Sequence, residues 1–305
     1  MKLFPKVYVL HHKDMDGYFA AAAHLQRFKP NIDSGEMTVE YIPVVYNKPI
    51  PEIPDGEDVQ VIIVDFSYSR EILIDLQSRV GNLLVIDHHA TAERQLQGLD
   101  FCVFDMTKSG NILSWDYFNP GIDPPTVHVL AQDYDLYTKL FKDSEYLEAG
   151  IQASGHWNDL MFYFELQNNP DKVAETINVG KIIYTHEYNQ CEYVLKGKQF
   201  KVIDFFGIKT ALVNWTGNPN MLSEVIYNTG EVQAVLSYKV RVNGNYKFSF
   251  RAPKNSGLGL DLIAEKFSGG GHESSAGFEI NEEVSYELLR RLYAETSSFG
   301  NAQQT

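Results

Sequence analysis

The sequence predicts an α/β protein with an N-terminal parallel-sheet domain covered by helices on both faces, a helical linker and a smaller C-terminal α/β domain. Two observations predict this fold. Short apolar runs alternate with helical patterns in the first part of the chain, as in a sheet with helical crossovers. In the last part, the turn signal Asn243-Gly244 separates two long alternating runs. The 305 residues suit two domains of ordinary size, and we expect boundaries at 1–135, 136–195 and 196–300.

Apolar runs and capping residues mark the elements of the N-terminal domain. The run 59–65 is almost entirely apolar and ends in Asp65, which is typical of a strand buried on both faces. Ser69 is a suitable cap for a helix over 70–80, and the run up to Asp87 repeats the strand pattern. The other expected elements are strands over 6–11, 38–46 and 101–105 and a helix over 17–26.

The remainder of the chain is expected to be a helical bridge followed by a mixed unit. Residues 136–195 have helical patterns rich in Tyr, Glu and Leu. Asn243-Gly244 predicts a hairpin between strands over 232–242 and 246–252. We also expect a strand over 207–213 and helices ending near Gly230, over 258–267 and over 284–295.

The charge of the chain restricts the class of partner. The formal net charge is −14, whereas proteins that hold long duplexes usually present a basic face. Short anionic substrates fit better, since metal ions can neutralise carboxylates locally. No run is apolar enough for a membrane span. Cys102 and Cys191 lack the spacing of metal ligands and are typical of thiols in a reducing compartment. Together with the lack of an apolar span, this predicts a cytoplasmic protein with no membrane partner.

Three expected strands end in side chains that can bind metal. Because ligands bind beyond the carboxyl ends of the strands in open α/β sheets, these side chains are expected at one edge. Asp133 or Asp135 offers a further acid. The candidates are the segment His12 to Gly17 with its acids Asp14 and Asp16, then Asp65, and then Asp87-His88-His89.

Carboxylates gathered in this way repel one another unless cations lie between them. Mixed His and Asp ligands without thiolates favour Mn²⁺ or a similar ion over a structural zinc. Two such ions can polarise a phosphoryl oxygen and activate water, with a carboxylate bridging them. Asp65 lies centrally among the strands and is the expected bridge. Any single Asp at a strand end is more often a turn or a helix cap, so the prediction depends on the coincidence of all three motifs.

These motifs, in this order, resemble the DHH phosphoesterase superfamily. Asp87-His88-His89 matches the motif that names the family, and His12 to Gly17 matches its first motif in RecJ-like and nanoRNase-like members. Asp65 matches the second motif, and an acid within 132–135 matches the fourth. The resemblance implies an N-terminal DHH domain.

The resemblance also implies roles for single residues. Two Mn²⁺ ions would occupy the site, with Mg²⁺ or Co²⁺ as alternatives. Asp65 would act in catalysis as the bridge, and His89 would act beside the metals or on the phosphate. His11 stays open as an alternative to His12, and Asp135 to Asp133. One ion would be held by His12, Asp14 and Asp65, and the other by Asp16, Asp65, His88 and Asp133.

The C-terminal part resembles a DHHA1 substrate-binding domain. Glycines let backbone N–H groups approach an anion, so a Gly-rich loop is a candidate phosphate cradle. Arg251 resembles the arginine that precedes this loop in DHHA1 domains. The residues implied in substrate binding are Arg251, Gly269, Gly270, Gly271 and His272. The strands around Asn243-Gly244 also carry Lys and Arg but no acid from 232 to 254, which favours a face for a phosphate backbone.

The sequence therefore predicts a metal-dependent phosphodiesterase acting on short single-stranded RNA or DNA or on small nucleotides. A 3′-phosphatase on a nucleotide bisphosphate and a cyclic-dinucleotide phosphodiesterase are alternatives with the same chemistry. A non-catalytic nucleic-acid-binding module is the alternative of a different class. The oligomeric state stays open, a homodimer included.

Overall fold

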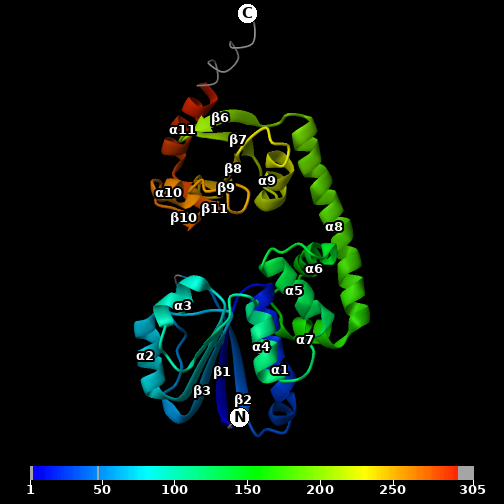
Figure 1. The fold of residues 1–305 in the computed structure, drawn as a ribbon, viewed down its shortest axis with the longest axis vertical. Coiled ribbons are helices and arrows are strands. Elements are labelled where there is room, and N and C mark those ends of the chain that lie inside the picture. The colour runs from blue at the N-terminus through cyan, green and yellow to red at the C-terminus, as the bar shows by residue number, and fades with distance from the viewer. Residues whose placement is uncertain (1–2, 47, 295–305) are drawn as a thin grey trace, which may run out of the picture. The chain divides into compact units, whose positions relative to one another are not determined.

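The computed structural model describes residues 3–46 and 48–294 and divides into two compact units, residues 1–184 and 185–305 (Figure 1). The expected α/β fold is confirmed. The first unit is built on a five-stranded sheet of order β2-β1-β3-β4-β5, in which all neighbours are parallel. Its strands are β1 (Lys6–His12), β2 (Thr38–Val44), β3 (Gly56–Val64), β4 (Val80–Asp87) and β5 (Cys102–Phe104).

Helices cover both faces of this sheet. In Figure 1, α1 (Met15–Asp33) and α4 (Gly110–Phe118) lie on one face, and α2 (Arg70–Arg79) and α3 (Ala90–Leu96) lie on the other. Each face has its own core because β3 and β4 are apolar on both sides. Ile62 and Ile86 pack with the α1 side, whereas Ile63 and Val85 pack with the α2 side. The central strands are thereby fixed, and their carboxyl ends are held at one edge.

The rest of the first unit is helical. The helices are α5 (Thr126–Asp135), α6 (Lys142–Ala153), α7 (Leu160–Asn168) and the start of α8 (Pro170–Lys196). They share a core with α1 that includes Tyr18, Phe19 and Tyr163, whose rings lie 4.8 and 4.9 Å apart in the Tyr18–Tyr163 and Phe19–Tyr163 pairs. Helix α8 continues into the second unit. Among the described residues, no helix is long and apolar enough to cross a membrane.

The second unit contains a mixed six-stranded sheet of order β10-β11-β9-β8-β7-β6. Only β7 and β8 are parallel within it. Phe248 and Phe250 are fully buried in its core. Its elements are β6 (Lys201–Phe205), β7 (Ile208–Asn214), α9 (Pro219–Tyr227), β8 (Ala234–Val240), β9 (Tyr246–Arg251), α10 (Leu260–Glu265), β10 (Gly270–His272), β11 (Ser275–Ile280) and α11 (Glu282–Ala294).

Two differences from the expected elements concern the second unit. The Gly-rich segment was expected to be a loop, but Gly270–His272 pairs with β11 as a short strand. The expected hairpin exists, although β8 ends at Val240 because the turn occupies 241–245, where Arg241 donates to the carbonyl of Asn245 at 2.7 Å. The end of the expected last helix, Glu295, and residues 296–300 of the expected third domain lie outside the described residues.

Candidate metal centre

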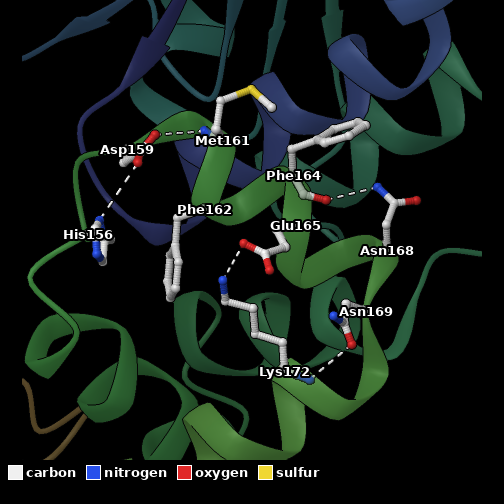
Figure 2. A pocket seen from close by; sticks show the side chains of 9 residues that line it. All are labelled: His156, Asp159, Met161, Phe162, Phe164, Glu165, Asn168, Asn169 and Lys172. Carbon is white, nitrogen blue, oxygen red and sulfur yellow. Dashed lines mark hydrogen bonds and ion pairs between the residues drawn. The ribbon is translucent and has the colours of Figure 1, made fainter.

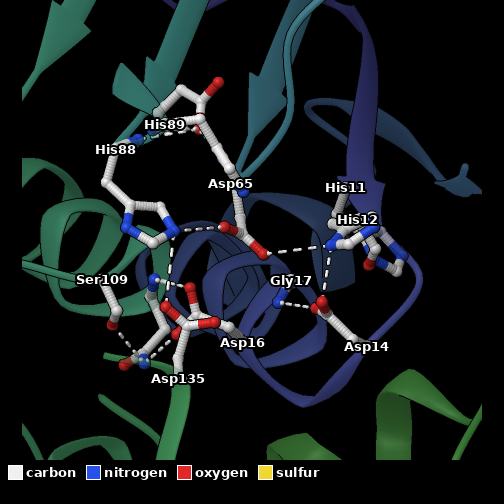
Figure 3. A network of polar contacts seen from close by, with 12 residues as sticks. His11, His12, Asp14, Asp16, Gly17, Asp65, His88, His89, Ser109 and Asp135 are labelled. Carbon is white, nitrogen blue, oxygen red and sulfur yellow. Dashed lines mark hydrogen bonds and ion pairs between the residues drawn. The ribbon is translucent and has the colours of Figure 1, made fainter. Parts of the chain in front are cut away.

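The carboxyl ends of β1, β3 and β4 bring the predicted ligands together. His12 ends β1, Asp65 follows β3, and His88 follows β4. Figure 3 shows these side chains converging with those of Asp14 and Asp16. Within the described part of the chain, three groups have ligand atoms close enough to share an ion. One is Asp65 with Asp87, His88 and His89, and the other two are His12 with Asp14 and Asp65, and Asp16 with His88 and Asp135.

The carboxylate of Asp65 lies between the group that contains His12 and the group that contains Asp16 and His88. Its Oδ1 is 3.2 Å from Nε2 of His88, and its Oδ2 is 3.8 Å from Nδ1 of His12. On the first side, Nδ1 of His12 is 2.5 Å from Asp14. On the other side, Nε2 of His88 is 3.4 Å from Asp135. One carboxylate therefore offers one oxygen to each group, which is the arrangement of a bridging ligand.

Asp65 adopts a strained backbone conformation. It is buried, and its φ of 54° lies in the left-handed region, which residues with a Cβ rarely adopt. Its N–H donates to the carbonyl of Ile86 at 2.8 Å, which fixes it against β4. Gly110 passes so close that a Cβ there would lie 2.4 Å from the Cβ of Asp65. The fold therefore holds Asp65 in one orientation and reserves the space beside it.

Three buried polar atoms of the cluster have no hydrogen-bond partner among the described residues. Both carboxylate oxygens of Asp65 and Nε2 of His88 are buried without a hydrogen-bond partner, and the 3.2 Å approach between them does not have hydrogen-bonding geometry. Such atoms cost free energy unless something binds them. Oxygen and imidazole ligands suit a divalent cation. These residues therefore fit a metal site.

Electrostatics supports the same conclusion. Burial raises the pKa of Asp65 well above its usual range, and the nearby carboxylates of Asp16 and Asp14 raise it further. Burial also raises the pKa of Asp16. Desolvation, together with Asp16 and Asp14, raises the pKa of Asp135 to about 8. Cations among these groups would reverse the shifts, because they favour the ionised carboxylates.

The first residue of Asp87-His88-His89 orients the other two. Asp87 is fully buried and accepts from the backbone N–H of His88 at 2.7 Å. Its Oδ1 is also 2.7 Å from Nδ1 of His89, and its Oδ2 accepts from Ser67 at 2.5 Å. The hydrogen bond to Asp87 raises the pKa of His89. Asp87 therefore fixes the turn and the ring of His89 at the edge of the cluster.

Asn111 supports Asp16 in a way that the sequence did not predict. Its Nδ2 donates to Oδ1 of Asp16 at 2.5 Å, and its backbone N–H is 3.2 Å from Oδ2. Ser109 directly precedes α4, but its side chain makes no capping hydrogen bond. Ser109 instead accepts from Nδ2 of Asn111 at 2.9 Å. Two polar residues at the start of a helix, Ser109 and Asn111, were the signal in the sequence.

A buried chain of polar groups continues behind Asn111. Nδ1 of His128 lies 2.9 Å from Oδ1 of Asn111, and Nε2 lies 2.9 Å from Oε1 of Gln167. Gln167 in turn donates to the carbonyl of Ala22 at 3.1 Å. Burial lowers the pKa of His128 to about 4. The side chain of Asn111 is therefore held by partners on α5 and, through them, on α7 and α1.

The sequence left two choices of ligand open, His12 or His11 and Asp133 or Asp135. His12 lies in the cluster, whereas His11 is buried, with its ring 4.5 Å from that of Tyr18. The expectation for Asp133 is corrected, because Asp135 lies beside His88 and Asp133 is turned away. Asp133 accepts from Thr138 at 2.6 Å and from Ser144 at 2.6 Å instead. The physical reason is that residues two apart on a helix point in different directions.

The predicted substrate residues lie in the second unit. Arg251 donates to Oδ1 of Asn220 at 2.6 Å and to the carbonyls of Phe250 and Ala276 at 3.0 and 2.9 Å. His272 is exposed on β10. Gly269 and Gly271 are required for packing, since a Cβ would lie 2.3 Å from the carbonyl oxygen of Gly277 and 2.4 Å from that of Ser275, respectively. Gly270 has open space around it.

A hollow elsewhere on the first unit contains none of the predicted residues. It has a volume of about 550 Å³ and lies along α7 and the start of α8 (Figure 2). Phe162 forms part of its wall, with the ring of His156 stacked 5.6 Å away and Nζ of Lys172 5.1 Å from its centre. Since these groups partner one another, the metal cluster is the better candidate site.

A parallel sheet with clustered carboxylates and histidines at its carboxyl edge has the ligand chemistry of a divalent-metal site. Residues 6–113 match the model of the DHH family, N-terminal domain. This match identifies the N-terminal part of the chain as a DHH-family domain. The matched region holds His12, Asp14, Asp16, Asp65, His88 and Asn111, whereas Asp135 lies beyond it.

One curated relative is an uncharacterized protein of Acanthamoeba polyphaga mimivirus. It is 25% identical over 256 residues, which is 78% of this chain and 58% of the relative. The chain thus spans just over half the length of that protein.

Solved structures share the fold at low identity. The DHH domain of a member of the s1p family of ribosomal proteins has a TM-score of 0.60 at 16% identity, over 95% of this chain and 86% of that one. An exonuclease RecJ bound to manganese has a TM-score of 0.55 at 14% identity, over 96% and 90%. The pGpG-specific phosphodiesterase PggH of Vibrio cholerae has a TM-score of 0.54 at 16% identity, over 95% and 99%.

Proposed function

We propose that this protein is a metal-dependent phosphodiesterase that hydrolyses short oligonucleotides or small nucleotides. The observation that carries the proposal is the carboxylate of Asp65, whose two buried and unpartnered oxygens face two separate groups of ligands. We propose two Mn²⁺ ions, with Mg²⁺ or Co²⁺ as alternatives. One would be held by His12, Asp14 and Asp65, and the other by Asp16, Asp65, His88 and Asp135.

Different residues of the chain have different roles in the proposed hydrolysis. Bound divalent ions polarise a phosphoryl oxygen and lower the pKa of water. Asp65 fixes the separation of the two groups, and Asn111 holds both oxygens of Asp16 in place. Because Nδ1 of His89 is engaged by Asp87, its Nε2 is the atom that can donate to a phosphate oxygen. The raised pKa of His89 keeps the ring protonated at higher pH, as such a donor requires.

We further propose that the second unit is a DHHA1-type substrate-binding domain. Arg251, His272 and the glycines 269–271 would contact the phosphate or the terminal nucleotide. The neighbouring strands supply positive charge: Lys239 and Lys247 are directly paired in the β8–β9 register. Burial and the nearby Arg241 and Lys239 lower the pKa of Lys247, and a bound phosphate would relieve this repulsion.

A non-catalytic nucleic-acid-binding module is the competing reading. The energetic cost of the cluster argues against it. A module that only binds gains nothing from Asp65, which combines a left-handed backbone with two buried, unpartnered oxygens. Such costs are characteristic of catalytic sites.

The proposal predicts that Asp65→Asn abolishes turnover while the fold is kept. Release of nucleotide from a linear dinucleotide such as pGpG, a nucleotide bisphosphate and a cyclic dinucleotide would be assayed with Mn²⁺ and with EDTA. We expect activity on at least one substrate, its loss in EDTA, and a fall of at least about a hundredfold in the variant, about 2.7 kcal/mol of barrier. Asp75→Asn on the exposed face of α2 is the matched control. If a folded Asp65→Asn protein kept more than a tenth of the rate, Asp65 would not be the bridge.

A further inference from the structure

The loop between α5 and α6, residues 136–141, is unusual in three ways. It starts directly after Asp135, whose carboxylate lies in the metal cluster. Two of its residues, Tyr137 and Lys139, each have a φ of 55°, in the left-handed region that residues with a Cβ rarely adopt. Its large apolar side chains are exposed, with exposed fractions of 42% for Tyr137, 75% for Leu140 and 46% for Phe141.

The buried carboxylate of Asp133 stabilises the strained backbone of this loop. Oδ1 of Asp133 accepts from the Thr138 hydroxyl at 2.6 Å and from the N–H of Leu140 at 2.7 Å. Oδ2 accepts from the N–H of Phe141 at 3.3 Å and from the Ser144 hydroxyl at 2.6 Å. Since charge-assisted hydrogen bonds are the strongest of their kind, the loop is held in a defined shape.

The exposed aromatic rings of this loop contribute little to the hydrophobic core. Strained backbone that is held by its surroundings gathers at functional sites, and exposed apolar groups together indicate a binding surface. The chemistry of Tyr137 is specific: Nζ of Lys139 lies 4.3 Å from the centre of its ring. An aromatic ring with an adjacent cation suits a ligand that has both a flat ring system and negative charge.

We propose that this loop is the platform on which a base of the nucleotide substrate stacks. Tyr137 is the main stacking surface and Phe141 the second. Tyr137 is two residues from Asp135, so at most about 7 Å of chain separates their Cα atoms. The base would therefore belong to a nucleotide adjoining the phosphate at the metal cluster. The proposal rests on the proposed function and names the part of the substrate that this loop recognises.

The test compares two substrates on the full-length protein with Mn²⁺: 5′-phosphorylated diadenylate and an analogue with the same backbone and no bases. Tyr137→Ala is expected to lower kcat/KM for diadenylate by about five- to a hundredfold, the range found for the loss of one stacked base. Phe141→Ala should have a smaller effect in the same direction. Neither variant should change turnover of the base-free analogue by more than about twofold.

Two further variants separate stacking from a structural role. Tyr137→Phe keeps the ring and should restore most of the activity on diadenylate. Tyr117→Ala removes a tyrosine of similar exposure, 37%, from α4 and should leave both substrates unaffected. Equal losses on both substrates in Tyr137→Ala, or no loss on diadenylate, would overturn the proposal.

Failure of the proposed function would be recognised separately. In that case the wild-type protein would hydrolyse neither substrate. Calorimetric titration of diadenylate into the Mn²⁺-loaded wild-type and Tyr137→Ala proteins would then decide the binding role alone. Binding that is equal in both proteins, or absent from the wild type, would contradict a base platform, whereas weaker binding in the variant would support it.

Discussion

At the scale of single residues, Asp133 and Asp135 have similar sequence surroundings and different roles. Both lie in the last turn of α5, and family register favoured Asp133 as the ligand. The distances assign the positions differently: Asp135 is 3.4 Å from His88, whereas Asp133 accepts hydrogen bonds from four groups in the 138–144 segment. Burial alone raises the pKa of Asp133, but the hydrogen bonds, first those from Ser144 and Thr138, bring it below its usual range.

These roles predict opposite phenotypes for two alanine variants. Asp135→Ala should lower bound Mn²⁺, because one group loses a ligand, with little effect on stability. Asp133→Ala should keep its metal at saturating Mn²⁺ but lose about 2–4 kcal/mol of unfolding free energy, because four donors, the buried Ser144 hydroxyl among them, lose their shared acceptor. Metal content of dialysed protein and urea unfolding measure the two effects. Metal loss confined to Asp133→Ala would return the ligand role to that residue.

At the scale of elements, α4 contributes more to the site than its sequence indicated. Its start provides Gly110, which leaves room for Asp65, and Asn111, which holds Asp16. The strands that end at His12, Asp65 and Asp87 were predictable, because continuous apolar runs and terminal acids are local patterns. The contact of α4 with Asp16 was not predictable, since it joins residues 95 apart that only the packed fold brings together.

The strands of the second unit also show that local patterns are predictable from the sequence whereas contacts between distant segments are not. The Asn243-Gly244 hairpin was predicted because its turn residues and alternation are local. Strand β10 was expected to be a loop, since three glycines favour a turn when considered alone. Its pairing with β11 depends on close backbone approach, which only glycine allows at positions 269 and 271. Patterns within a segment were therefore interpretable, whereas pairings that depend on a distant partner were not.

The position of Asn111 predicts a change in metal dependence. Asn111→Ala removes the side-chain donor to Asp16 and should weaken Mn²⁺ affinity by about ten- to a hundredfold, the usual effect of losing a residue that orients a ligand. Activity should recover at saturating Mn²⁺. The control is Asn119→Ala, which removes another buried amide of the same helix region that donates to the carbonyl of Ala23. The control should lose stability without a shift in the Mn²⁺ requirement. Equal shifts in both variants would indicate a general structural effect.

At the scale of the whole molecule, the candidate metal ligands and the candidate phosphate-binding residues of the DHHA1-like part lie in different units. Every candidate metal ligand lies within residues 1–184, whereas Arg251 and His272 lie within 185–305. Each unit has its own hydrophobic core, and α8 joins them. A substitution in the second unit should therefore alter substrate recognition without altering the metal centre.

His272→Ala is the cleanest test of this division, because His272 is exposed and its loss disturbs no packing. A hydrogen bond to a charged phosphate contributes about 1.5–3 kcal/mol, so kcat/KM for a nucleotide substrate should fall about ten- to a hundredfold. Mn²⁺ affinity and turnover of bis-p-nitrophenyl phosphate should stay near wild type. Arg251→Ala should show the same selectivity together with a loss of stability, since Asn220 and two backbone carbonyls lose their donor. Calorimetric Mn²⁺ titration and steady-state kinetics on both substrates measure these effects. A parallel loss of both activities, or of metal affinity, in His272→Ala would show that the two units do not divide the work in this way.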